Sequence, residues 1–123
     1  MYEISVQRHF DAAHYLRDYN GRCENLHGHR YQLAVTMRAQ QLDGIGLAFD
    51  FTALKKVIGE VILAHYDHVC LNDIAPYTEI NPSAENIART IFEALARALP
   101  KDNALLYSVT VWESPDSWCT YTP

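Results

Sequence analysis

Alternation of apolar and polar side chains constrains the fold of this chain more than any other feature of its sequence. From Tyr2 to Val6 every second residue is apolar and the residues between are polar, which is the period of a half-buried strand. The same parity continues through Phe10 and Ala12 to His14. The pattern therefore predicts a first strand that carries a histidine on its apolar side.

Three further stretches show the same alternation and predict three more strands. They run over residues 31–37, 105–111 and 118–121. His27 and His29 precede the first of these stretches and share the parity of its apolar residues. If that strand extends back to them, both imidazoles point to the apolar side of the sheet.

Two helices are expected between these strands. Apolar residues recur at helical spacing from Leu54 to Ile62 and from Ile87 to Leu99. Asp50 or Thr52 can cap the first helix, and Pro100 ends the second. His65 continues the apolar stripe of the first helix and is expected to pack in the core.

The order β-β-α-α-β-β predicts an α+β fold, with an antiparallel four-stranded sheet and two helices on one face. A length of 123 residues fits a single domain spanning residues 1–123. The uncovered face and the sheet edges favour a homo-oligomer.

Charge and composition exclude several classes of partner. The 10 Lys and Arg residues against 15 Asp and Glu give a net charge of -5, which excludes a general basic field for nucleic acid or an anionic membrane. The N-terminal residues lack a signal-peptide pattern, and no apolar run could span a bilayer, so we expect a cytoplasmic protein. The three cysteines are an odd number without a CxxC spacing and are expected to be reduced thiols.

The strongest chemical signal is a pair of histidines separated by one glycine. His27 and His29 project to the same side of an extended segment, and His14 can reach the same ion from the neighbouring strand. Three neutral imidazoles suit Zn²⁺ and leave a fourth position open for water or substrate. An isolated pair of this kind is more often two polar surface residues, but His14 and Cys23 shift the interpretation toward a metal.

The other candidate residues belong to less specific sequence patterns. Cys23 can be a fourth zinc ligand, a packed thiol or an activated base. Asp67 beside His68 can hold a tautomer or pass a proton, although such a dipeptide is more often a solvated helix end. Glu113 continues the alternation of the third predicted strand, so its carboxylate either faces the buried side, where a ligand with paired N–H groups can bind it, or is turned to solvent by a bulge.

At these residues the chain resembles the 6-pyruvoyl-tetrahydropterin synthase / 6-carboxytetrahydropterin synthase family. The matching segments, in chain order, are Phe10-Asp11-Ala12-Ala13-His14, Cys23 with His27-Gly28-His29, Asp50-Phe51, Asp67-His68 with Leu71-Asn72, Pro82-Ser83-Ala84-Glu85-Asn86, and Glu113. The resemblance implies the tunnelling fold, in a homo-oligomer that we expect to be a hexamer with active sites at subunit interfaces.

The resemblance also implies a metal centre and a base. It assigns His14, His27 and His29 to zinc and Cys23 to the general base.

The remaining implied roles concern proton transfer and the substrate. Asp67 and His68 would form a proton relay, Glu113 would bind the amino and ring N–H groups of a pterin, and Ser83 would contact the pterin. The implied substrate is 7,8-dihydroneopterin triphosphate.

The spacing of Cys23 from the histidine pair resembles the branch that forms 6-carboxy-5,6,7,8-tetrahydropterin for queuosine and deazapurine synthesis, a lyase reaction. The alternatives are a 6-pyruvoyl product or, because Glu24 stands three residues before His27, cleavage to 6-hydroxymethyl-dihydropterin for folate synthesis. A carboxylate at Glu24 can contact and deprotonate a substrate hydroxyl. A non-enzymatic alternative is a zinc oligomer in which Cys23 and the three histidines close a structural site.

Overall fold

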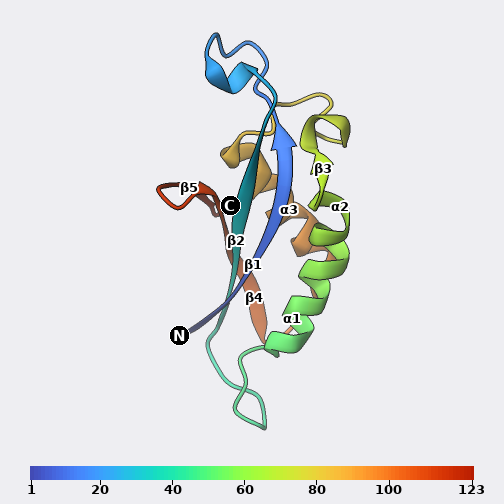
Figure 1. Cartoon of the computed structure of the whole chain (residues 1–123). Helices are drawn as coiled ribbons and strands as arrows, with labels where there is room; N and C mark the ends of the chain where they lie inside the picture. The colour runs from blue at the N-terminus through green and yellow to red at the C-terminus, as the bar shows by residue number, and fades with distance from the viewer.

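A computed structural model describes all 123 residues and shows a twisted sheet with its helices on one side (Figure 1). Strands β1 (Tyr2–His14) and β2 (His27–Ala39) pair antiparallel along their whole length, with Tyr2 opposite Ala39 and His14 opposite His27. Strand β4 (Ala104–Ser114) pairs with β2, and β5 (Ser117–Tyr121) pairs with β4. The α+β class and the helix-covered face are confirmed.

The sheet has five strands instead of four. The additional strand, β3 (Val69–Cys70), pairs parallel with Ala12 and Ala13 at the edge of β1, so the strand order is β3-β1-β2-β4-β5. A two-residue strand is too short to show any periodicity in the sequence, which is why alternation did not predict it.

The first helical segment is continuous but not uniform. It comprises α1 (Phe51–Ile58), a π-helical turn η2 (Gly59–Leu63) and α2 (Ala64–Tyr66). The prediction that His65 packs in the core is wrong, since His65 is exposed and Tyr66 is buried in its place. A π turn adds one residue to the helical repeat, so the buried face moves on by one position.

Helix α3 (Ala84–Ala98) presents the predicted stripe to the core. Short 3-10 turns, η1 (Arg22–Glu24) and η3 (Leu71–Asp73), lie in loops. No helix combines the length and apolar character needed to cross a membrane.

The hydrophobic core fills the space between the helices and one face of the sheet, and 23 buried apolar residues contribute to it. The prediction for the start of β4 was partly wrong, because Leu105 and Tyr107 are exposed. A β-bulge at this point pairs Leu106 with Met37, which reverses the parity before Val109.

Candidate metal centre and active site

Four polar side chains meet on the helix-covered side of the sheet, where β1 ends and β2 begins. They are His14, His27, His29 and Glu113, and one possible ligand atom from each lies within 4.8 Å of the others. The strand register produces this cluster, because His14 is directly opposite His27 and His29 follows two residues later on the same face. Glu113 arrives from the end of β4.

Backbone carbonyls determine the tautomers of two of these histidines. Nδ1 of His14 lies 2.8 Å from the carbonyl oxygen of Pro82, and Nδ1 of His27 lies 2.6 Å from that of Asn25. A carbonyl can only accept, so each Nδ1 carries the proton and each Nε2 keeps a free lone pair. A histidine that binds a metal usually donates its other ring N–H to a carbonyl or carboxylate in this way.

The Glu113 carboxylate approaches these imidazoles closely. Its Oε1 lies 3.2 Å from Nε2 of His14 and 3.5 Å from Nε2 of His29. Both Nε2 atoms are buried and have no hydrogen-bond partner. A lone pair of His14 that faces a carboxylate is unfavourable unless a proton or a cation lies between them. Three nitrogen donors, with the Glu113 oxygen near two of them, therefore fit a divalent metal ion.

The electrostatics of the cluster favour the protonation states that bind a cation. Burial lowers the pKa of His29, although the nearby Glu113 opposes this shift. In the metal-free cluster, a hydrogen bond from a protonated Nε2 of His14 lowers the pKa of Glu113, and partial burial opposes that shift. A neutral imidazole and an ionised carboxylate are the forms that bind metal ions.

The structure also shows which way Glu113 points, which parity had left open. The pairing of β4 with β5 is irregular between Trp112 and Ser114, yet the carboxylate reaches the histidines on the helix-covered face. Glu113 thus lies in the same cluster as the three histidines.

Cys23 and Glu24 lie together on η1, in the loop that projects at one end of the sheet (Figure 1). Cys23 is partly buried, and its carbonyl accepts a hydrogen bond of 2.7 Å from the backbone N–H of Leu16. Its sulfur is not among the clustered ligand atoms. Glu24 is exposed and forms no ion pair. The Cys23 thiol therefore lies outside the cluster of the three histidines and Glu113.

Two asparagines hold the start of this loop, a role that the sequence did not predict for either of them. The amide of Asn72 bonds both the N–H and the carbonyl of Tyr15, each at 3.0 Å. Asn81 holds the backbone of Arg17 in the same way, at 2.9 and 3.1 Å. Each side-chain amide makes the two backbone hydrogen bonds that a neighbouring strand would otherwise make. The backbone at the start of the loop that carries Cys23 is therefore held in place.

Asp67 and His68 lie apart from the histidine cluster, in a second group with Asp11. The backbone of Asp11 holds both residues, because its N–H donates to Oδ1 of Asp67 at 2.9 Å and its carbonyl accepts from the N–H of His68 at 2.7 Å. His68 has a left-handed backbone, with φ of 61°. Nε2 of His68 lies 3.7 Å from Oδ2 of Asp67, which is adjacent but too long for a hydrogen bond.

Ser83 has a structural task. Its hydroxyl caps α3 by accepting a hydrogen bond of 3.2 Å from the N–H of Asn86. The preceding residue is Pro82, whose carbonyl holds His14. The cap therefore also fixes the backbone that orients a candidate metal ligand.

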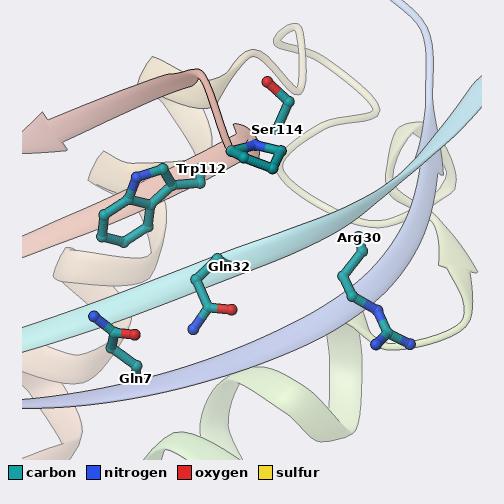
Figure 2. A pocket seen from close by; sticks show the side chains of 6 residues that line it. Gln7, Arg30, Gln32, Trp112 and Ser114 are labelled. Carbon is teal, nitrogen blue, oxygen red and sulfur yellow. The ribbon is translucent and has the colours of Figure 1, made fainter.

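Two hollows lie on the side of the sheet without helices. One, of about 470 Å³, is lined by side chains that include Gln7, Gln32 and Trp112 from β1, β2 and β4 (Figure 2). It contains none of the histidines. The other is a shallow depression of about 500 Å³ that passes both His29 and His68. It borders His68, whereas the imidazoles of His14, His27 and His29 meet on the helix-covered face of the sheet.

Comparisons with known proteins agree with this geometry. The family model "6-pyruvoyl tetrahydropterin synthase" matches residues 3–123. The chain is 31% identical to the 6-carboxy-5,6,7,8-tetrahydropterin synthase of Bacillus subtilis, covering 99% of this chain and 86% of that protein. It is also 31% identical to the enzyme of the same name from Haemophilus influenzae, over 98% and 99% of the two chains.

The fold matches a solved structure equally well. The 6-pyruvoyl tetrahydropterin synthase of Caenorhabditis elegans superposes with a TM-score of 0.85 at 30% identity, covering 100% of this chain and 97% of that one. With the family model matching almost every residue, the chain belongs to the 6-pyruvoyl tetrahydropterin synthase family of enzymes.

Proposed function

We propose that this protein is a zinc-dependent lyase that converts 7,8-dihydroneopterin triphosphate into 6-carboxy-5,6,7,8-tetrahydropterin, a precursor for queuosine and other deazapurines. The proposal of a metal rests on one observation: the Nε2 atoms of His14 and His29 are buried, have no hydrogen-bond partner and face Glu113. The choice of product rests on the two bacterial relatives with 31% identity, which are both named 6-carboxy-5,6,7,8-tetrahydropterin synthase.

Zinc, when bound, would polarise the hydroxyl groups of the substrate side chain and acidify the neighbouring C–H. His14, His27 and His29 would hold it, and Glu113 would supply a carboxylate oxygen to the metal or to the pterin N–H groups. The carbonyls of Pro82 and Asn25 keep two of the imidazoles in the ligating tautomer.

Cys23 would act as the base that takes a proton from the substrate. Its sulfur lies outside the group of clustered ligand atoms, which suits a proton acceptor better than a permanent ligand. This placement also disfavours the structural alternative, a closed site of one cysteine and three histidines.

Asp67 and His68 would pass protons at the other end of the depression. The side chain of His68 is 79% exposed, and a proton relay works best when water is excluded. A homo-oligomer with active sites at subunit interfaces, expected as a hexamer, would cover it, and Ser83 would then contact the pterin near the start of α3.

Product analysis tests the proposal. Zinc-loaded protein is incubated with 7,8-dihydroneopterin triphosphate, and the products are separated by chromatography. We expect 6-carboxytetrahydropterin together with acetaldehyde and triphosphate. A 6-pyruvoyl product, or no turnover with or without zinc, would contradict the assignment.

A second activity, cleavage to 6-hydroxymethyl-dihydropterin, is favoured by one observation. Glu24 is exposed on the same short turn as Cys23, so two different proton acceptors stand before His27. If each residue takes a different proton from the substrate, Glu24→Ala abolishes the hydroxymethyl product and Cys23→Ala abolishes the carboxy product. An unchanged product ratio in Glu24→Ala would show that Glu24 is a solvated loop residue.

A further inference from the structure

Tyr31 is a buried tyrosine directly behind the metal cluster. Its ring is fully buried and stacks on Phe10 at a centroid distance of 5.0 Å. The rings of His14 and His29 stand edge-on to it at 5.7 and 5.5 Å. The Tyr31 hydroxyl has no hydrogen-bond partner.

The other two buried tyrosines provide a contrast. The hydroxyls of Tyr66 and Tyr77 bond to each other at 2.6 Å. A buried hydroxyl without a partner destabilises a fold, and phenylalanine would fill the same space without that penalty. The only other buried side-chain polar atoms that lack partners are Nε2 of His14 and of His29. All three orphaned atoms belong to side chains whose rings contact one another, with centroids 5.0 to 5.7 Å apart.

The strand register brings Glu113 next to Tyr31. Gln32 is opposite Trp112 in the pairing of β2 with β4, so Tyr31 and Glu113 are the adjoining positions on the two strands and lie on the same face. A tyrosine hydroxyl keeps its proton at neutral pH, so it can donate a hydrogen bond to an anionic acceptor.

Binding of a cation changes what Glu113 can contact. The Glu113 Oε1 now faces His14 and His29, but a nitrogen that ligates a metal has no proton to donate to a carboxylate. A ligand carboxylate is itself normally held by a hydrogen bond from the surrounding shell. Tyr31 is the unused donor on that side of the cluster.

We propose that Tyr31 is a positioning residue of the metal centre, whose hydroxyl donates a hydrogen bond to the Glu113 carboxylate when the histidines ligate zinc. This inference rests on the proposed zinc site and adds to it a residue that acts through Glu113. On this proposal the Tyr31 hydroxyl has a hydrogen-bond partner only when the metal is bound.

The test compares Tyr31→Phe with Tyr77→Phe, which removes the hydroxyl of a tyrosine that is equally buried but already paired. Zinc affinity is measured by competition with a chelating dye, and the melting temperature is measured for metal-free and zinc-loaded protein. Tyr31→Phe should weaken zinc binding by roughly 10- to 100-fold, the range for groups that hydrogen-bond to a metal ligand, while the metal-free melting temperature stays equal or rises. Tyr77→Phe should lower both melting temperatures and leave zinc affinity unchanged.

A double-mutant cycle shows whether Tyr31 acts through Glu113. Once Glu113→Gln is present, adding Tyr31→Phe should weaken zinc binding much less than it does in the wild type. Wild-type zinc affinity in Tyr31→Phe, equal losses of stability with and without metal, or fully additive effects would overturn the inference while leaving the zinc site intact. Failure of the wild type to bind zinc would instead remove the zinc site, and this inference with it.

Discussion

The two groups of acidic and histidine side chains lie on opposite faces of the same pair of strands, and they differ in how far their polar atoms are satisfied. Asp11, in the exposed group, has both carboxylate oxygens bound by Arg30, at 2.9 and 3.1 Å. This contact lowers the pKa of Asp11. In the histidine group, the Nε2 atoms of His14 and His29 are buried and unpartnered. Closeness alone therefore does not make a metal site, since the lone pairs must also be free.

The largest effect should come from removing a ligand nitrogen. We expect His29→Ala to lose stoichiometric zinc, a larger loss of affinity than the ~100-fold that follows when a group hydrogen-bonded to a metal ligand is removed. The matched variant on the other face, His68→Ala, should keep one zinc per chain and lose turnover. Metal analysis after dialysis measures the zinc content of both variants. Retention of zinc by His29→Ala together with its loss from His68→Ala would contradict the assignment of the metal to the histidine group.

Cys23 should separate catalysis from metal binding. Cys23→Ala removes a proton acceptor without removing a ligand, so turnover should fall at least ~100-fold while zinc content and fold persist. Cys119→Ala, which changes another partly buried thiol, is the control and should remain active. Near-normal turnover of Cys23→Ala would show that its thiol is a spectator.

Glu113→Gln keeps the shape of the side chain but replaces one acceptor oxygen with a donor. Pterin binding should weaken by about 1.5–3 kcal/mol, the range for a charge-assisted hydrogen bond. Titration of the zinc-loaded protein with a pterin measures this loss. A variant that binds the pterin as tightly as the wild type would assign Glu113 to the metal alone.

Acid should destabilise the metal-free protein in two steps, first through His29 and then, at lower pH, through Glu113. Burial lowers the pKa of His29 below its ordinary value of 6.5, so its stabilising contribution is complete above pH 6.5 and is lost as the pH falls below it. The Glu113 contribution disappears only below its ordinary pKa of 4.5. In chelator-treated protein, the free energy of unfolding should therefore decline below pH 6.5, and His29→Ala should flatten the first part of that decline. An unchanged profile would contradict the assignment.

The smallest effect concerns the helix caps. Ser83→Ala and Asp50→Ala each remove a cap hydrogen bond and should each destabilise the fold by about 1 kcal/mol. Only Ser83 adjoins the Pro82 carbonyl that holds His14, so only Ser83→Ala should also weaken zinc binding. Equal zinc affinities in the two variants would show that the cap does not influence the metal ligand.

Sequence periodicity predicted the long strands, the helices and the face on which His14, His27 and His29 lie, because each of these depends on a repeated local pattern. It did not predict β3 or the exposure of His65, since a two-residue strand and a π turn leave no periodic signal. It also missed Tyr31, which has the appearance of an ordinary core residue until its hydroxyl is found without a partner. Whether a polar group is satisfied depends on contacts between distant residues, such as His14 with Pro82.

Cobalt titration of the metal-free protein tests the central claim most directly, because the spectrum reports both the number and the type of ligands. We expect one equivalent of Co²⁺ per chain, with bands typical of a nitrogen and oxygen site and no intense thiolate charge-transfer band. The spectrum should be lost in His29→Ala and unchanged in Cys23→Ala and His68→Ala. A strong thiolate band that disappears in Cys23→Ala, or a spectrum that depends on His68 and not on His29, would contradict the account.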